Sequence, residues 1–343
     1  MEQVAIIGVD LAKNSFQLHG AAEDGTVVFR KRLSRMQFHK FMSAHPKCVV
    51  AMEACGGAHF WAQELGTIGH TVKLISPRYV KPFVKRQKND AADAEAIVEA
   101  AQRPTMRVVS PKTEEQRSRA VAFRVRQQLI RQRSDLVNAL RSHLYEFGYI
   151  APKGINHLHR LEAVIADDTT HLPKVARAMC QMLLEQVHCL SEKIALLNRE
   201  ISTLSRKSEI SSRLQTMPGI GPICAMAIET FAPPMQSFQS GRDFAAWLGL
   251  VPLQKSSGGK QRLGRTSKMG QSDIRRLLIV GAMAVAQWSS RKGAAAGSWL
   301  ERMLEKKPLM LVVIALANKM ARGIWAMLTR EQNYRDPSEQ AAA

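Results

Sequence analysis

The sequence has few cysteines, and their spacing argues against two kinds of stabilised protein. The five cysteines, Cys48, Cys55, Cys180, Cys189 and Cys224, are odd in number, lie far apart and form no C-x-x-C pair. Neither a disulfide framework nor a zinc site is therefore indicated. The pattern is typical of a protein that works in a reducing cytosol.

Long apolar runs and several enzyme motifs are also missing. The N-terminus has no basic region followed by a signal-type apolar core, and the longest apolar runs, such as residues 309–317, are too short to cross a bilayer. The chain contains no G-x-x-x-x-G-K-[ST] nucleotide-binding motif and no H-E-x-x-H or H-x-x-E-H metal motif. We expect a soluble, cytoplasmic protein with no membrane partner and no use of nucleoside triphosphates.

Acidic residues are scarce relative to basic ones. Lysine and arginine total 49 against 29 acids, which leaves a net charge of +20 over 343 residues. The excess is spread along the chain, so we expect a polyanionic partner, nucleic acid before membrane. A ribosomal or chromatin protein would share the charge but would seldom contain so much apolar sequence. The length predicts two or three domains.

The first third of the chain reads as an α/β domain. Apolar or alternating segments predict strands and helices in the order β-β-β-α-β-α-β-α, with strands at residues 4–9, 15–20, 26–33, 48–52 and 71–76 and helices at 35–44, 58–65 and 91–101. Three antiparallel strands followed by two helix–strand units are typical of a ribonuclease-H-like fold. We place this domain at residues 1–108.

The remainder is predicted to be mainly helical. A helical region at 109–210 contains two long helices, 113–147 and 173–205, and the second carries a sustained heptad seam of apolar residues. The seam fits either an intramolecular antiparallel hairpin or a coiled coil between protomers. A third domain, 211–330, has a Pro-Gly-x-Gly turn at 217–221 like that of a helix-hairpin-helix motif, and apolar helices at 244–250, 274–288 and 308–328. Residues 331–343 read as a disordered tail.

Four acids stand where a metal site could form. Asp10 and Glu53 end the first and fourth strands, which are neighbours in a ribonuclease-H-like sheet, and Asp90 and Asp93 open the helix at 91–101. Taken singly, each is more often a turn or cap residue. Taken together, converging carboxylates need cations to offset their repulsion, and hard oxygen ligands suit Mg²⁺ or Mn²⁺. Two such ions would activate a phosphodiester. Glu95 and Glu99 read as solvated surface acids.

Two basic segments are candidate nucleic-acid contacts. The first precedes the aspartate helix, and the second is a glycine-rich loop at 255–268. Their cations are Arg78, Lys81, Lys85, Arg86 and Lys88 in the first and Lys255, Lys260, Arg262, Arg265 and Lys268 in the second. Ser257, just before Gly258-Gly259, is the best-placed hydroxyl for nucleophilic attack, but no histidine is near in sequence to activate it. On the loop alone, a serine that merely contacts phosphate is the favoured interpretation.

Motifs in both halves resemble one known family. Ile7-Gly8-Val9-Asp10-Leu11-Ala12-Lys13, Met52-Glu53-Ala54-Cys55-Gly56 and Lys88-Asn89-Asp90-Ala91-Ala92-Asp93-Ala94 resemble the DEDD tetrad of the insertion-sequence one-ten transposases, relatives of the Piv-type DNA invertases. Pro218-Gly219-Ile220-Gly221, Gly249-Leu250-Val251-Pro252, Ser256-Ser257-Gly258-Gly259 and Ser267-Lys268-Met269-Gly270 resemble that family's second domain. The likeness covers nearly the whole chain, with the motifs in the expected order.

The resemblance implies more than the spacing does. It implies a RuvC-like first domain whose Asp10, Glu53, Asp90 and Asp93 bind Mg²⁺, and a serine nucleophile that maps to Ser257, with Ser256 as the neighbouring alternative. It also implies strand exchange between donor and target DNA, guided by a structured non-coding bridge RNA. Homodimers that assemble into homotetramers are expected, with composite sites, and an association with the nucleoid during action.

Three functions remain distinguishable. The first is a transposase and site-specific DNA recombinase with a serine nucleophile. The second is a metal-dependent endonuclease of the Holliday-junction-resolvase type, in which water attacks and no covalent intermediate forms. The third is a basic nucleic-acid scaffold in which the acids are structural. The acid tetrad makes the scaffold the weakest of the three.

Overall fold

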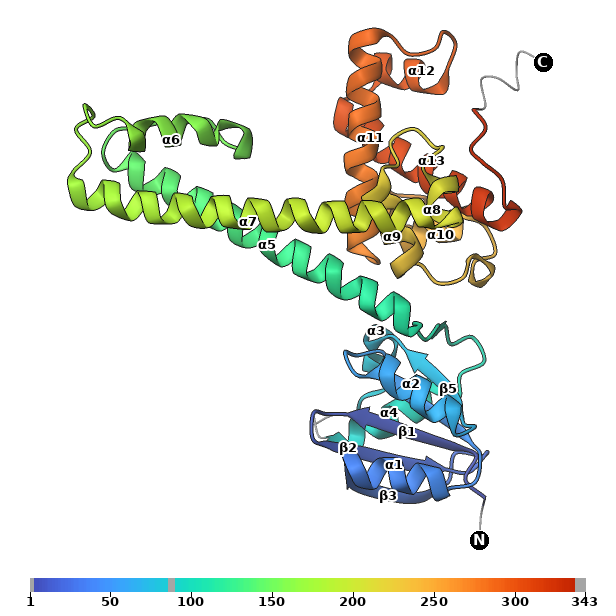
Figure 1. Ribbon diagram of the computed structural model, residues 1–343. Coiled ribbons are helices and arrows are strands. Elements are labelled where there is room, and N and C mark those ends of the chain that lie inside the picture. The colour runs from blue at the N-terminus through green and yellow to red at the C-terminus, as the bar shows by residue number, and fades with distance from the viewer. Residues whose placement is uncertain (1–2, 86–89, 337–343) are drawn as a thin grey trace. The chain divides into compact units, whose positions relative to one another are not determined.

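The computed structural model describes residues 3–85 and 90–336. Its contacts divide the chain into two compact units, residues 1–114 and 115–343, and each is described by itself. The first is an α/β unit and the second is mainly helical (Figure 1). The three-domain division expected from the sequence, with the helical region 109–210 as a domain of its own, stays a prediction.

The first unit contains the mixed sheet that the sequence predicts. Its elements are β1 (Ile6–Leu11), β2 (Ser15–Ala21), β3 (Val27–Ser34), α1 (Arg35–Ala44), β4 (Val49–Glu53), α2 (Ala58–Thr67), β5 (Thr71–Ile75), α3 (Pro77–Val80), the short 3₁₀ helix η1 (Lys81–Phe83), α4 (Asp90–Ala101) and β6 (Val108–Val109). The strand order is β3-β2-β1-β4-β5-β6. β1 pairs antiparallel with β2 and parallel with β4, so the first and fourth strands are neighbours as expected.

Helices cover both faces of this sheet. One core lies between the sheet and α1 and α2, with Val9 and Phe16 among its residues. A second core lies under α4 and includes Ile6 and Ala51. Because β1 is buried on both faces, it reads as a continuous apolar run rather than an alternating one. α1 begins at a capping box formed by Ser34 and Gln37, which satisfies two backbone N–H groups and sets its first residue.

The second unit contains the long helices and the C-terminal elements. They are α5 (Glu114–Tyr145), η2 (Ile155–His157), α6 (Leu158–Ala166), α7 (Lys174–Lys207), α8 (Glu209–Leu214), α9 (Pro222–Phe231), η3 (Met235–Ser237), α10 (Gly241–Trp247), β7 (Pro252–Gln254), β8 (Leu263–Thr266), α11 (Ser272–Lys292), α12 (Trp299–Lys306) and α13 (Leu309–Arg330). The sequence did not predict α6, α12 or the β7–β8 pair. Their segments are short, or rich in glycine and polar residues.

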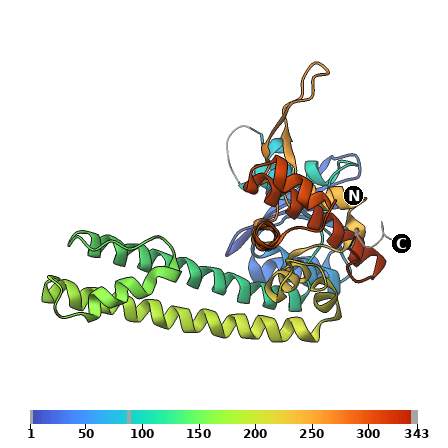
Figure 2. The same cartoon turned by 90° about the horizontal axis from the view of Figure 1, so that it is seen from above.

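α5 and α7 form an antiparallel hairpin within the chain, side by side in both views (Figures 1 and 2). Arg126 Nε donates to Asn198 Oδ1 at 2.6 Å, and Arg133 donates to Ser191 Oγ at 3.3 Å. Each step of seven residues along α5 is therefore matched by seven in the opposite direction along α7, the heptad spacing seen in the sequence. Burial and the nearby guanidinium groups of Arg276 and Arg133 lower the pKa of Arg126.

Apolar side chains also lie on the outside of this helical hairpin. They include Val121, Val125, Val175, Met179, Met182 and Leu196, each at least 45% exposed. The end of the hairpin is closed by a separate cluster in which Leu140 and Leu144 of α5 pack with Leu161 of α6 and Cys180 of α7. The hairpin thus has its own core and leaves part of its apolar surface to solvent.

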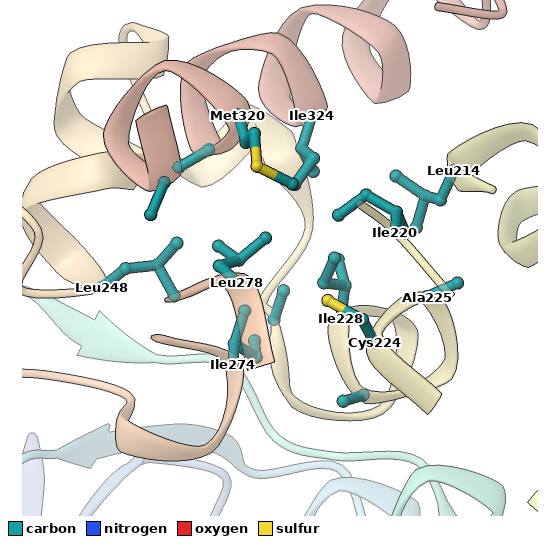
Figure 3. Packing of buried hydrophobic residues seen from close by; sticks show 14 of the residues in the cluster. Leu214, Ile220, Cys224, Ala225, Ile228, Leu248, Ile274, Leu278, Met320 and Ile324 are labelled. Atoms are coloured by element: carbon teal, nitrogen blue, oxygen red, sulfur yellow. The ribbon is translucent and has the colours of Figure 1, made fainter. Parts of the chain in front are cut away.

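The core of the second unit gathers α8 to α11 and α13 (Figure 3). Ile220 of the turn after α8 lies in the same cluster as Leu278 of α11 and Ile324 of α13. α13 is long and apolar enough to pass a length-and-composition test for a membrane span. Its buried face packs within this core, with Val313 and Ala317 fully buried, as expected for the central helix of a globular unit.

The start of the expected C-terminal tail packs against this core. The backbone N–H of Tyr334 donates to Thr216 Oγ1 at 2.9 Å, and the Tyr334 ring packs on the main apolar cluster. Residues 337–343 lie outside the described residues. His159 lies in the first turn of α6.

A half-buried carboxylate joins three helices of the second unit. Glu229 of α9 accepts hydrogen bonds from Ser208 and Ser211 at 2.6 and 2.8 Å, and from Arg119 of α5 at 2.6 Å. Burial raises the pKa of Glu229, but the serine and arginine hydrogen bonds outweigh it and leave this pKa below its usual range. The ionised form therefore stabilises the native state.

We predict that Glu229→Gln lowers the free energy of unfolding by about 1–3 kcal/mol at pH 7, because a half-buried arginine loses its charged partner. Since folding lowers the pKa of Glu229, its contribution is present above the unfolded-state pKa and is lost as the pH falls through the folded-state pKa. Urea unfolding at pH 7 and pH 4 measures both effects. Glu209→Gln is the matched control, because Glu209 is 85% exposed in its pair with Arg213. Equal losses in both variants would contradict the prediction.

Candidate active site

Strand register brings Asp10 and Glu53 to the same end of the sheet. Val9 of β1 lies opposite Met52 of β4 in a parallel pair, so the next residues, Asp10 and Glu53, follow at matched positions on adjacent strands. The pairing of these strands and their common direction are those that the sequence predicts. The two carboxyl-bearing residues are therefore neighbours at the carboxyl end of the parallel strands.

Both residues belong to the face that α4 covers. Side chains alternate between faces along a strand, and Ile6 of β1 and Ala51 of β4 pack in the cluster under α4. Asp10 is four residues after Ile6, and Glu53 is two residues after Ala51. Their side chains therefore leave the sheet on the α4 face. Both are half-buried, and both interact with neighbours in the structure.

α4 runs antiparallel to β1 and touches it closely at Gly8. A Cβ added at Gly8 would lie 2.4 Å from the Ala94 carbonyl oxygen and 2.6 Å from Val98 Cγ2. At the other end, Lys73 Nζ donates to the Ala101 carbonyl at 3.4 Å, a favourable place for a cation at a helix C-terminus. Gln102, just after α4, lies near the start of β1, because a Cβ at Gly25 in the β2–β3 turn would be 3.8 Å from Gln102 Oε1 and Ala21 of β2 pairs with Ile6. Moving along β1 from Gly8 to Asp10 therefore leads towards the start of α4, where Asp90 and Asp93 are.

Asp93 is half-buried in the first turn of α4. Asp90 is the first residue of that helix, but its side chain lies outside the described residues. Within the described part of the chain, no group of three or more acidic, histidine or cysteine side chains is close enough to hold a metal ion. The four-carboxylate site expected from the sequence, with Mg²⁺ or Mn²⁺ as its ion, therefore stays a prediction.

An ion-pair cluster fixes α4 to the far side of the sheet. Glu95 pairs with Arg30 of β3 at 3.1 Å and also with Lys85, which precedes the helix. The hydrogen bond from Lys85 is the main cause that holds the pKa of Glu95 below its ordinary range. The expectation that Glu95 is a solvated surface acid was wrong, because β3 brings a cation to it across 65 residues of sequence. No local motif marks this pair.

A buried histidine lies in line with that cluster. His19 of β2 is opposite Gly8 on one side and Arg30 on the other, and its side chain is 3% exposed. Burial lowers the pKa of His19, and the charges of Arg30 and Lys85 lower it further against the opposing effect of Glu95. A neutral imidazole therefore lies beneath α4. No motif in the sequence marks His19.

The basic run before α4 is partly helical. Val80 of α3 is buried, and Phe83 of η1 packs against the cluster under α4. These two anchors leave Arg78, Lys81 and Lys85 exposed. Arg86 and Lys88, which complete the predicted nucleic-acid track, lie outside the described residues. Lys85 has a carboxylate partner in Glu95.

The glycine-rich loop of the second unit is a β-hairpin that projects from the unit (Figure 2). Gln254 of β7 pairs with Leu263 of β8, and Ser257 pairs with Lys260 across the tip. Gly258 and Gly259 occupy the two turn positions with φ of 56° and 75°. Positive φ at both positions is the requirement of a type I′ turn, which explains the Gly-Gly pair. The sequence predicted an irregular loop here.

The register sorts the residues of the hairpin onto two faces. Ser257, Lys260, Lys255 and Arg262 lie on one face, since Ser257 pairs with Lys260 and Lys255 N donates to the Arg262 carbonyl. Gly264 shares this face, because a Cβ there would lie 3.5 Å from Lys255 Cε. The opposite face carries Gln254, Ser256, Gln261 and Leu263 near the tip and Arg265 near the base. Three cations thus accompany Ser257, and neutral groups surround Ser256.

The two serines also differ in their hydrogen bonds. Ser256 Oγ accepts from the backbone N–H of Arg262 at 3.3 Å and so helps to hold the two strands together. Ser257 is exposed beside the tip of the hairpin, and its carbonyl accepts from Lys260 N at 3.1 Å. Its side chain is therefore presented outward by the turn. The remaining predicted contacts, Arg265 and Lys268, are exposed nearer the base.

Backbone packing anchors the base of the hairpin. A Cβ at Gly270 would lie 1.9 Å from the Trp247 carbonyl oxygen, and a Cβ at Gly249 would lie 2.7 Å from Met269 N. Lys268, with φ of 52°, donates its N–H to the Gly249 carbonyl at 3.1 Å. The glycines of two sequence motifs thus permit α10 and the start of α11 to meet backbone to backbone, which fixes the hairpin to the core.

The Pro-Gly-x-Gly turn connects α8 to α9. Gly219 has φ of 88°, and a Cβ there would lie 2.9 Å from the Gly281 carbonyl of α11. This glycine is therefore required for helix packing. Gly221 precedes α9, and a Cβ there would meet nothing within 4 Å. If the turn contacts phosphate, Gly221 is where the backbone is accessible.

The chain matches two transposase family models and is similar to several transposases over nearly its whole length. Residues 7–148 match a family model for DEDD transposases of the IS110 type, described as Transposase, and residues 211–296 match the model described as Transposase IS116/IS110/IS902 family. The chain is 46% identical to a probable family 20 transposase of Pseudomonas aeruginosa over 96% of its own length and 98% of that protein. It is 41% identical to the transposase for insertion sequence element IS1328 of Yersinia enterocolitica, over 96% and 98% of the two chains. It is 35% identical to the transposase for insertion sequence element IS1111A of Coxiella burnetii, over 98% and 92%.

The contact at Gly8 generates a stability prediction. Gly8→Ala should lower the free energy of unfolding of the first unit by about 1–3 kcal/mol, because its methyl group must displace α4 from β1. Gly66→Ala is the matched control: Gly66 lies in α2, a Cβ there meets nothing within 4 Å, and alanine in a helix stabilises by about 0.5–1 kcal/mol. Urea unfolding of the full chain compares them. A Gly8→Ala variant as stable as the parent would show that α4 does not pack on β1 this closely.

Proposed function

Because the chain belongs to the IS116/IS110/IS902 family of insertion-sequence transposases, we propose that it is a DNA recombinase that exchanges strands between donor and target DNA with a carboxylate-bound metal and a serine nucleophile. One observation carries the proposal. The same chain holds acids at the ends of two adjacent parallel strands beneath α4 and an exposed hairpin that presents Ser257 among three cations.

The donor set of the first unit suits Mg²⁺ or Mn²⁺. Asp10, Glu53, Asp90 and Asp93 would hold the ion, since carboxylate oxygens are the ligands that these hard cations prefer. Asp10 and Glu53 belong to the face under α4, and α4 starts beyond Gly8 in the direction of Asp10. When bound, the metal supplies electrostatic stabilisation of the charge that develops on the phosphate. The protein's part is to hold the strand ends and α4 in fixed relation.

Ser257 is the proposed nucleophile. Its Oγ attacks a DNA phosphorus, the Oγ–P bond forms, and one P–O ester bond of the backbone breaks. The serine proton is lost and the leaving oxygen gains a proton, so no water is consumed and the energy of the ester is kept in the phosphoserine. A hydroxyl of another DNA strand then attacks the phosphoserine, which joins the phosphate to that strand and releases Ser257. Ser256 is the alternative nucleophile, and its hydroxyl accepts from Arg262 N.

The proposed nucleic-acid partners are inferred from the charge of the chain and from the family resemblance. A net charge of +20 favours phosphate-rich partners, and Arg78, Lys81, Arg86 and Lys88 before α4 form the proposed track, with Lys85 joining when it leaves Glu95. A structured bridge RNA is the proposed guide that pairs with both DNAs. Gly221 is a proposed phosphate contact at the helix-hairpin-helix-like turn. The protein would act in the cytoplasm, at the nucleoid.

Assembly of two and then four copies is the remaining part of the proposal. The α5–α7 hairpin leaves Val175 and Met179 exposed, and apolar residues at helical spacing on a long arm are suited to a coiled-coil contact with a second copy. Sites composed of elements from different protomers would then explain how a serine on one unit serves a metal site on the other.

The test combines full-length protein, Mg²⁺, a transcript of the non-coding DNA beside the gene, and duplexes carrying the element's ends and its target junction. We expect strand exchange and a protein–DNA adduct on denaturing gels. Asp10→Asn should reduce both by at least about 100-fold, because the metal loses a ligand. Ser257→Ala should abolish the adduct, and Ser256→Ala should retain it. Intact exchange in both Asp10→Asn and Ser257→Ala would refute the proposal.

A second candidate is a structure-specific endonuclease in which water attacks. The strand-end acids of the first unit favour it, because that unit carries the predicted metal site without the serine hairpin. Branched DNA cleaved in Mg²⁺ with no trapped adduct, and with full activity in Ser257→Ala, would support this alternative over the recombinase.

A further inference from the structure

The β7–β8 hairpin separates its two serines by face, and this separation has a chemical consequence. From Gln254/Leu263 to Ser257/Lys260 the strands pair without a shift, and the irregularity lies nearer the base. Within this regular part, Lys255, Lys260 and Arg262 share the face of Ser257. Near the tip, the residues that share the face of Ser256 are Gln254, Gln261 and Leu263, which carry no charge, and the nearest cation on that face, Arg265, lies towards the base. A phosphate drawn to the hairpin therefore meets the Ser257 face.

We propose that Lys260 and Arg262, supported by Lys255, form a clamp for the attacked phosphate, and that Lys260 contacts its non-bridging oxygens while Ser257 Oγ bonds to phosphorus. This inference rests on the proposed serine chemistry. It adds the residues that bind the reacting group and a physical reason for Ser257 over Ser256. The ligand is a DNA phosphodiester.

The distance across the tip supports Lys260 as the nearest cation. Lys260 N donates to the Ser257 carbonyl at 3.1 Å, which marks a narrow hydrogen-bonded pair with Cα atoms about 5.5 Å apart and side chains on one side of the ribbon. A lysine side chain is longer than this separation. An oxygen of any phosphate bonded to Ser257 Oγ therefore lies within reach of Lys260 Nζ.

The cations of this face are not neutralised within the described part of the chain. No ion pair there involves Lys255, Lys260 or Arg262, although nine ion pairs are present elsewhere in it. Three like charges on one ribbon face repel, and an anion relieves that repulsion. A phosphodiester gains negative charge as the fifth bond forms, so the clamp binds the transition state more tightly than the ground state.

The Gly-Gly turn makes this arrangement reliable. A slip of one residue would move every side chain of a strand to the opposite face and would exchange Ser256 for Ser257. Positive φ at Gly258 and Gly259 fixes a two-residue loop and hence the register. Ser256 Oγ, bonded to Arg262 N, further holds the strands on the neutral side.

The experiment measures the rate of covalent adduct formation by the full chain with its transcript, Mg²⁺ and element-end DNA, at saturating and limiting DNA. Lys260→Ala should slow adduct formation at saturating DNA on the order of 100-fold, as loss of one transition-state donor does. Arg262→Ala should act in the same direction, and Lys260→Arg should recover most of the rate. Gln261→Ala is the matched control, because Gln261 is exposed on the opposite face of the same hairpin. This variant should leave the saturated rate unchanged.

A neutral substrate separates the clamp from a general effect on folding. Once the wild-type adduct has located the attacked phosphate, a methylphosphonate at that position removes its charge. The Lys260→Ala defect should then fall to within about threefold of the parent, because the methylphosphonate transition state lacks one of the two negative charges, the one that the lost cation would offset. Circular dichroism melts of the variants should match the parent, since the hairpin is exposed.

The outcomes distinguish the clamp from the chemistry on which it rests. A wild-type adduct that needs Ser257 but forms at the parent rate in Lys260→Ala and Arg262→Ala overturns the clamp and leaves the recombinase intact. An equal defect in Gln261→Ala, or a Lys260→Ala defect unchanged on methylphosphonate, also overturns the clamp. Absence of any wild-type adduct overturns the serine mechanism itself.

Discussion

The close approach of α4 to β1 at Gly8 is the contact on which the first unit depends. Only a residue without a Cβ lets the Ala94 carbonyl and Val98 reach the strand at this point. Because α4 runs antiparallel to β1, with Gln102 just after its C-terminus near Gly25 of the β2–β3 turn, its first turn lies in the direction of the strand ends. Asp93 lies in that first turn, and Asp10 and Glu53 follow the paired residues Val9 and Met52 at the ends of their strands. The steric fit between α4 and β1 at Gly8 produces this arrangement.

Ion pairs then stabilise the position that packing gives to α4. The ion pairs of Glu95 with Arg30 and Lys85 hold α4 to the sheet. These pairs are partly exposed, so each contributes modestly. Their value lies in geometry, since they link β3, the basic run and α4. The neutral His19 beneath them adds no further positive charge to the core.

Glycines also permit close backbone contacts in the second unit, at a turn between helices and at the base of the serine hairpin. Gly219 meets Gly281, and Gly270 meets Trp247, so turn, helix and hairpin base pack backbone to backbone. Gly258 and Gly259 differ, because no atom crowds them, and only their positive φ requires glycine. The first two contacts make a rigid base. The turn at the tip sets the register that places Ser257 with Lys260 and separates it from Ser256.

The sequence by itself determined the main strands and helices of the first unit, the long helices of the second unit and the residue types that could carry the chemistry. Local periodicity along the chain predicts these elements. It accounts for the apolar runs that end in Asp10 and Glu53, the heptad seam of α7 and the helix that begins at Asp90. Only the tertiary structure decided which residues meet. The pairing of Glu95 with Arg30, the packing of Gly8 under Ala94 and the intramolecular pairing of Arg126 with Asn198 join segments far apart in sequence, and no local pattern records a partner. The two faces of the serine hairpin were likewise decided only by the structure. A polar, glycine-rich segment has no hydrophobic alternation from which its faces could be predicted, and hydrogen bonding across the turn sets its register.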